Sequence, residues 1–240
     1  MFKVPETILK EYSQEMQTIY GDNLVSVVLY GSSVSDEYDP KKSDLNFLIV
    51  LKDSSITELK KAKKAIEKWQ KKKVAVPLVL DQEYIKSSLD TFPIEFLNMV
   101  RQYHMVYGED ILFSLKFEKE DIRLQCEREL KGKSLRLRQS YLEAKKLRRD
   151  LGLVIHDSLT AFVAIFKALL YLKGKEIPAD RAGVVAATCE DFGLNAETFE
   201  KLMQVRKGEL KLKDEEMESL FEDYARQIRS LSDKVDKIKL

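Results

Sequence analysis

Two short polar stretches, each beside an apolar run, carry the residue types best suited to chemistry. Gly31 and Ser32 end one apolar run, and Asp44 and Asn46 open another. In a β-strand, residues two apart share a face, so we expect Asp44 and Asn46 to point the same way. Glycine lets the main chain approach a ligand, and successive backbone N–H groups form an anion-binding nest. A polyphosphate with a divalent cation would fit between such a turn and such a pair.

The elements that must position these residues alternate between helix and strand up to about residue 110. Apolar residues recur at three- and four-residue spacing over residues 5–20, which is typical of a helix, and residues 56–73 predict a second, strongly basic helix. One or two further helices are expected before residue 105. Short β-branched and apolar runs predict strands over residues 24–30, 45–51, 74–80 and 103–107. Pro77 cannot donate a ladder hydrogen bond, so the third strand is expected near an edge or at a bulge.

The second half of the chain differs from the first, because its sequence contains helical patterns and no strand candidate. Five helical stretches separated by Gly or Pro signals are expected, over residues 118–149, 151–173, 178–192, 196–207 and 214–238. We therefore predict an α+β fold: a mixed sheet flanked by helices in residues 1–115, followed by an all-α helical bundle in residues 116–240.

Composition and charge exclude several classes of protein. The chain is 44% hydrophobic and 34% charged, as in an ordinary globular protein, and 41 Lys and Arg nearly cancel 40 Asp and Glu. No global field recruits nucleic acid or membrane, so an anionic partner must be held by a local patch. The two cysteines and two histidines lie far apart and form no zinc-site spacing: Cys126, Cys189, His104 and His156.

No segment predicts export or membrane insertion. The N-terminus lacks a basic stretch followed by an uninterrupted apolar core, so no secretory signal is expected. The most apolar run, residues 160–172, is too short to cross a bilayer and carries Lys167. We expect a cytoplasmic protein with no membrane partner.

The chain resembles the DNA polymerase beta type nucleotidyltransferase superfamily in two stretches, LYGSS at residues 29–33 and SDLNFLIVL at residues 43–51. That family carries Gly-Ser after an apolar strand, then Asp-x-Asp in a second strand and a third carboxylate in a later one. Ser43 precedes the first acid as in many antibiotic nucleotidyltransferases. The helical second half is similar in kind to the substrate-binding bundle of kanamycin-type nucleotidyltransferases.

The resemblance implies transfer of a nucleoside monophosphate from a nucleoside triphosphate to a hydroxyl acceptor, either a small molecule or a protein. Magnesium ions held by carboxylates would activate the acceptor and stabilise the leaving pyrophosphate. Carried over to this chain, the family's pattern implies that Gly31 and Ser32 bind the triphosphate tail, with Ser43 beside them. Asp44 becomes the first metal ligand, and Asn46 takes the place of the second.

Asn46 departs from the family's pattern. An amide oxygen brings no negative charge, and a unit charge about 4 Å from another at an effective dielectric of about 20 is worth about 4 kcal/mol. Losing it beside a dication would weaken or abolish one metal site. Catalysis therefore stays open, and the alternative is a catalytically inactive nucleotide-binding or interaction module of the same fold.

Asp81 is the nearest candidate for the third carboxylate, because it follows the third expected strand. It stands at the end of that strand, whereas the family's acid usually lies mid-strand and faces inward. The alternative is that Asp81 caps a helix that begins at Gln82.

Two questions about partners stay open. Residues 131–149 carry eight basic residues against one acid, Glu143, and could bind a polynucleotide. A solvated helix face accounts for the same charges, so nucleic acid is the less favoured partner. The sequence also leaves open a homodimer in which a second subunit completes the cleft.

Overall fold

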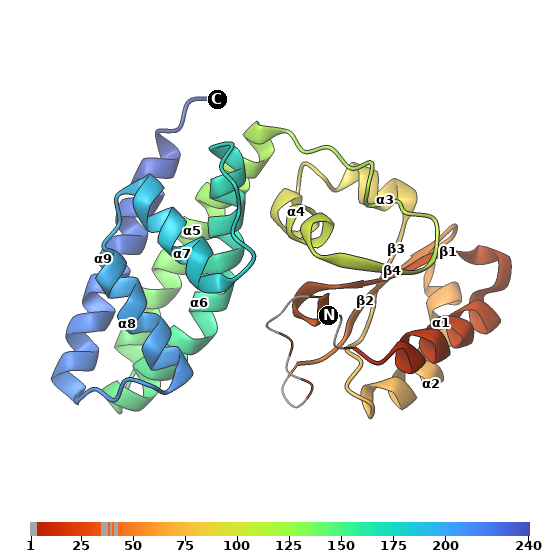
Figure 1. Ribbon diagram of the computed structural model, residues 1–240, viewed down its shortest axis with the longest axis horizontal. Helices are drawn as coiled ribbons and strands as arrows, with labels where there is room; N and C mark the ends of the chain where they lie inside the picture. The colour runs from red at the N-terminus through yellow and green to blue at the C-terminus, as the bar shows by residue number, and fades with distance from the viewer. Residues whose placement is uncertain (1–3, 35–37, 39, 41–42) are drawn as a thin grey trace. The chain divides into compact units, whose positions relative to one another are not determined.

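The structure is a computed structural model that describes residues 4–34, 38, 40 and 43–240 of the 240-residue chain. The chain divides into two compact units, Met1–Phe117 and Glu118–Leu240 (Figure 1). The boundary predicted after residue 115 lies two residues before this division.

Helices and strands alternate in the first unit, as the sequence predicts. Their bounds, in chain order, are α1 Glu6–Tyr20, η1 Gly21–Asn23, β1 Leu24–Tyr30, η2 Gly31–Val34, β2 Asn46–Leu51, α2 Ile56–Gln70, β3 Leu78–Asp81, α3 Gln82–Ser87, α4 Pro93–Arg101 and β4 Tyr103–Gly108.

The strands of the described chain form a four-stranded sheet in the order β3–β2–β1–β4. β1 runs antiparallel to β2 and β4, whereas β2 and β3 are parallel. Alternate residues of β2 enter opposite cores: Phe47 and Ile49 belong to the core shared with α1 and α2, and Leu48 and Val50 to the core shared with α3 and α4. Figure 1 shows these two helix pairs on opposite sides of the sheet. The predicted mixed sheet flanked by helices is therefore confirmed.

β3 is an edge strand and shorter than predicted. Its regular pairing with β2 begins at Leu78, and an isolated bridge between Leu45 and Val74 precedes it. Pro77 stands between the two stretches of pairing, where its missing N–H interrupts the ladder. The expected edge position is confirmed.

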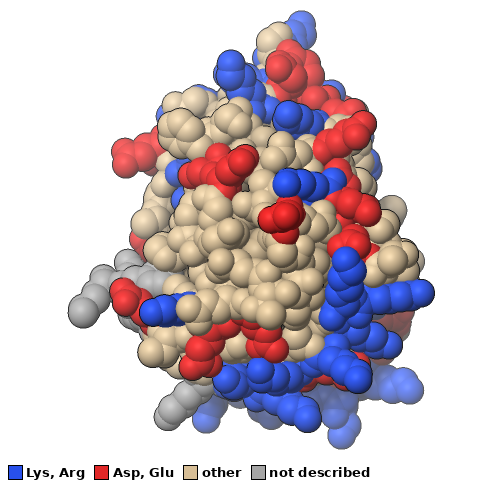
Figure 2. Space-filling view, turned by 90° about the vertical axis from the view of Figure 1, so that its right-hand side faces the viewer, with Lys and Arg blue, Asp and Glu red and all other residues tan. Residues whose placement is uncertain are grey.

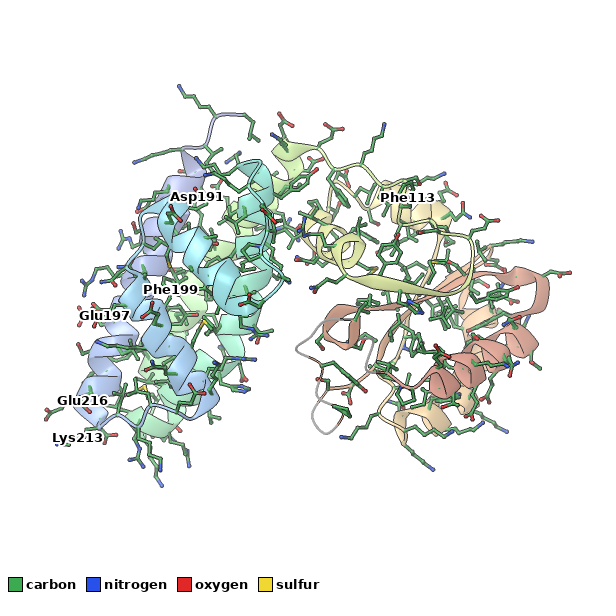
Figure 3. All side chains as sticks on the ribbon, in the orientation of Figure 1. Phe113, Asp191, Glu197, Phe199, Lys213 and Glu216 are labelled. Atoms are coloured by element: carbon green, nitrogen blue, oxygen red, sulfur yellow. The ribbon has the colours of Figure 1, made fainter. Side chains whose placement is uncertain are left out.

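The second unit is an all-α bundle, as predicted, with α6 in contact with each of the other helices. Their bounds are α5 Lys119–Glu143, α6 Leu147–Leu172, α7 Arg181–Phe192, α8 Ala196–Lys207 and α9 Asp214–Asp236. Phe199 lies inside the bundle (Figure 3), with its ring edge-on to those of Phe166 and Tyr224 at centroid distances of 5.8 and 6.2 Å. Such aromatic contacts fix the relative rotation of the helices that carry them.

The break between α5 and α6 differs from the prediction. It was expected at residue 150, but α5 ends at Glu143 and α6 begins at Leu147. The Asp150 carboxylate accepts the backbone N–H groups of Lys145 and Lys146, both at 3.0 Å. These hydrogen bonds, led by that from Lys146 and followed by the Arg149 side chain, lower the pKa of Asp150 to about 2. Asp150 therefore starts a helix, because it satisfies donors that the first turn leaves unpaired.

The helix that contains the apolar run 160–172 is longer than that run, which was judged too short to cross a bilayer. It is 26 residues long, so by length and composition alone it could cross a membrane. Half of its most apolar window is buried inside the unit, and the core helix of a soluble protein meets the same criterion. α6 is accounted for as the central helix of the bundle.

Candidate functional site

The two polar stretches meet at one end of the sheet. The antiparallel register pairs Tyr30 with Asn46, so the turn that follows β1 lies beside the start of β2. Gly31 has φ +80°, in the left-handed region that glycine tolerates. A methyl group added to Gly31 would lie 3.5 Å from Nδ2 of Asn46. The structure thus brings Gly31 and Asn46 together.

The turn itself is held from two sides. The Gly31 N–H donates to the Gln102 carbonyl at 3.3 Å, and the buried Ser33 hydroxyl donates to the Tyr30 carbonyl at 3.0 Å. Ser32, between them, is exposed. The turn therefore has a fixed main chain and presents Ser32 at the surface.

Asp44 is an exposed carboxylate immediately before β2. Its side chain forms no hydrogen bond or ion pair with any residue that the structure describes. Leu45, the next residue, is buried, and its N–H donates to the Lys73 carbonyl at 2.9 Å. Ser43, which precedes Asp44, is half-buried. Asp44 is thus held at the same end of the sheet as the Gly31 turn, with its carboxylate available.

Asp81 lies at the opposite end, which corrects its assignment as the third carboxylate. The parallel register pairs Asp81 with Leu51, five residues along β2 from Asn46. Five strand residues span about 16 Å. Asp81 accepts hydrogen bonds from the Ser54 hydroxyl at 2.6 Å and the Tyr84 N–H at 2.7 Å, and these contacts, Ser54 first, lower its pKa. The alternative, a helix N-cap, is confirmed.

The segment that does lie beside Asn46 carries no acid. The Ala75 N–H donates to the Leu45 carbonyl at 3.0 Å, so residues 74–80 run alongside the start of β2. Their sequence is VAVPLVL, and Val76 is 63% exposed. Across the described residues, no three His, Cys, Asp or Glu side chains are grouped to hold a metal ion.

The donors that the described residues offer here do not fit a pair of magnesium ions. Magnesium takes octahedral oxygen ligands and favours carboxylates, and a two-metal site needs several of them. Asp44 contributes one carboxylate and Asn46 one neutral amide.

Two basic residues beside this site were not predicted. Lys73 has φ +62°, unusual for a residue other than glycine, and its ammonium donates to the Pro40 carbonyl at 3.3 Å in the segment between the two polar stretches. Arg101 ends α4 directly before Gln102, which binds the Gly31 N–H. Partial burial lowers the pKa of Arg101. Both lie outside the motif, and only the sheet pairing brings them close.

The basic helix α2 is partly neutralised within the first unit. Figure 2 shows Lys and Arg gathered in the lower part of the face that it views. Lys68 and Lys72 of the α2 region pair with the α1 acids Glu15 and Glu11 at 2.9 and 3.3 Å. The Trp69 indole N–H also donates to Glu15, at 2.8 Å. These contacts fasten α2 to α1, so part of its charge serves packing.

A cavity of about 620 Å³ lies at the Asp81 end of the sheet. Asp53, Asp81 and Glu83 are among the residues that line it. Three carboxylates against Lys52 would repel a polyphosphate. The Gly31 end is therefore the candidate site for an anion.

Comparisons with known proteins bear on both units. Residues 9–104 match the family model of the nucleotidyltransferase domain. No curated protein matches the chain. Among similar solved structures is spectinomycin adenyltransferase AAD(9) from Enterococcus faecialis, crystallised with ATP and spectinomycin, with 15% identity and a TM-score of 0.55. The match covers 93% of this chain and 99% of that one, so the two proteins share a fold that includes the helical second unit.

Proposed function

We propose that the first unit, whose residues 9–104 match the nucleotidyltransferase family model, binds a nucleoside triphosphate but no longer transfers a nucleoside monophosphate efficiently. Binding rests on the Gly31 turn and its basic surroundings. The loss of transfer rests on Asn46 at the second carboxylate position and on the lack of a third carboxylate beside it among the described residues.

Nucleotide binding is supported by the form of the turn and by the charges near it. Gly31 adopts the left-handed region and reverses the chain after β1, and the N–H groups that follow Gly31 would form a nest that suits a phosphate oxygen. The Lys73 carbonyl accepts the Leu45 N–H, and Arg101 directly precedes Gln102, whose carbonyl accepts the Gly31 N–H. Cations at such positions would offset the charge of a triphosphate tail. The shared fold agrees with this role, since the similar adenyltransferase was solved with ATP.

One observation carries the loss of transfer: the segment alongside Asn46 is apolar, and Asp81 is a helix cap at the far end of β2. Metal-assisted phosphoryl transfer depends on charge that several ligands supply together. With Asp44 as the remaining motif carboxylate, magnesium would contribute little to binding.

The competing function is active transfer to a hydroxyl group on a small molecule or protein. It is favoured by Asp44, which keeps the motif position and has no partner among the described residues. Polynucleotide binding by residues 131–149 has less support, because four of the eight basic residues there form ion pairs with acids: Lys131, Lys133, Arg136 and Arg149.

The test is a calorimetric titration with a non-hydrolysable nucleoside triphosphate, in magnesium and in chelator, on wild type and Asn46→Asp. The wild type should bind with nearly the same affinity in both conditions. Asn46→Asp should tighten binding in magnesium by about tenfold, or about 1.4 kcal/mol, because it restores a carboxylate beside Asp44.

Asn195→Asp is the matched control. It adds the same charge at the N-cap of α8 in the helical unit, where aspartate caps as well as asparagine, so binding should not change. The proposal fails if the wild type binds no nucleotide, or if it incorporates labelled nucleoside monophosphate into an acceptor at a rate that Asn46→Asp does not raise.

A further inference from the structure

An apolar groove lies on the surface of the helical unit, between α5 and α9. Its volume is about 400 Å³, and it is lined by Arg138, Tyr141, Leu142, Phe221, Glu222 and Ala225. The residues all belong to the second unit, so the groove is a property of that unit alone.

Two leucines in or beside the groove are strongly exposed. Leu142 is 82% exposed, and Leu135, two turns earlier on α5, is 60% exposed. Single exposed leucines are ordinary on a protein surface, but leucines seven residues apart on one helix beside an apolar groove form a stripe. Covering such a stripe with another surface removes apolar area from water, which lowers the free energy of the complex.

The aromatic floor of the groove is already fixed. The Tyr141 ring stacks on Phe221 at a centroid distance of 6.3 Å and an interplanar angle of 21°, and the Tyr141 hydroxyl donates to the Glu218 carboxylate. Phe221 is buried beneath it and edge-on to Tyr224. A partner would therefore meet a preformed surface and would not have to order it.

The two banks of the groove carry opposite charges. Arg138 on the α5 bank is exposed and forms no ion pair with any described residue. Glu222 on the α9 bank is 78% exposed and has one long contact, at 3.8 Å, with Arg226 of its own helix. α5 and α9 pack side by side (Figure 1) and run antiparallel, since Lys131 approaches Asp236 while Tyr141 contacts Glu218.

We propose that this groove is a self-complementary interface that binds a second copy of the chain. A two-fold axis that runs along the groove places the α5 bank of each copy opposite the α9 bank of the other. Arg138 of one copy then faces Glu222 of the other on both sides of the axis, and the leucine stripes cover each groove. A two-fold axis across the groove would instead oppose like charges, which selects the first arrangement.

The test uses charge reversal, measured by analytical ultracentrifugation over a concentration series. Wild type should associate as concentration rises, whereas Arg138→Glu and Glu222→Arg should each weaken association by about tenfold or more, because each opposes like charges. An equimolar mixture of the two variants should associate like wild type. In the mixed pair the glutamate introduced at position 138 faces the arginine introduced at position 222, and the native Arg138 faces the native Glu222.

A second pair of variants tests the apolar contact. Leu142→Glu should abolish association, whereas Leu153→Glu should not, since Leu153 is 58% exposed on α6 and does not line the groove. Circular dichroism confirms that each variant keeps its helices. Wild type that stays monomeric at every concentration overturns the proposal, and so does a mixture of charge variants that fails to associate.

Discussion

The two ends of the parallel pair β2–β3 differ in what their carboxylates already contact. At one end Asp44 is exposed and has no partner among the described residues, and the Gly31 turn lies beside the same end of β2. At the other end Asp81 is held by Ser54 and by the first turn of α3. A carboxylate whose acceptor capacity is used by local structure serves the fold, whereas one that stays open is available to a ligand.

The largest expected effect comes from Gly31→Ala. The added methyl group has room, because its nearest neighbour is 3.5 Å away, but an L-residue at φ +80° costs about 1–2 kcal/mol. We expect the turn to relax to a less strained backbone conformation, which would turn its N–H groups away from a bound phosphate. Nucleotide affinity measured by calorimetry should therefore fall about tenfold.

Gly21→Ala is the matched control for Gly31→Ala. Gly21 also has positive φ, at +51°, and nothing lies within 4 Å of an added methyl group. Both variants should lose stability in chemical denaturation, but Gly21→Ala should keep nucleotide affinity. Equal affinities for the two variants would mean that the Gly31 turn holds no phosphate.

A smaller effect with a diagnostic sign is expected from Asp44→Ala. In chelator, nucleotide should bind about fivefold more tightly, because removing one charge near the phosphates relieves about 1 kcal/mol of repulsion. Any increase in nucleotide affinity that magnesium gives the wild type should be absent in Asp44→Ala. Glu83→Ala removes the same charge at the Asp81 end and should change neither titration. If both variants changed nucleotide affinity equally, the two ends of β2–β3 would not differ in nucleotide binding.

The smallest effect belongs to Asp81, and it concerns stability. Asp81→Ala should lower the free energy of unfolding by about 1 kcal/mol without changing nucleotide affinity, because it removes the N-cap of α3. Asp81→Asn keeps a capping side chain and should lose less.

The pH dependence of unfolding sharpens this prediction. The folded state lowers the pKa of Asp81, so its stabilisation is present above the ordinary aspartate pKa and is lost as pH falls through the folded pKa. Urea denaturation between neutral pH and about pH 3 should show this loss in the wild type and a smaller one in Asp81→Asn. A pH-independent difference between the two proteins would contradict the capping role.

The sequence predicted the parts of this fold that depend on local pattern. Alternation placed Asn46 and Phe47 on opposite faces of one strand, and the motif spacing brought Gly31 beside Asn46. Residues 9–104 match the nucleotidyltransferase family model, in agreement with the resemblance seen in the two polar stretches. Helical periodicity predicted the bundle of the second unit.

What the sequence missed depends on which residues share an end of the sheet. Parallel pairing of β2 with β3 sends Asp81 away from Asp44, and no local pattern reports the direction of a neighbouring strand. Lys73 and Arg101 were overlooked for the same reason, since only the main-chain hydrogen bonds of Lys73 and of Gln102, the residue after Arg101, place them near the site. The helix break lies earlier than expected because Asp150 accepts the N–H groups of Lys145 and Lys146 and so belongs to the first turn of α6.

Pro77 and the irregular β4 pairing also set how copies of this protein can meet. β3 is four residues long and follows Pro77, which lacks an N–H, and the β1–β4 ladder shifts register between Val27 and Val28. Neither rim is a flat template on which another chain could extend the ladder, so edge-to-edge polymerisation is disfavoured. The self-association proposed for the groove between α5 and α9 would then depend on side-chain surfaces and not on a strand edge.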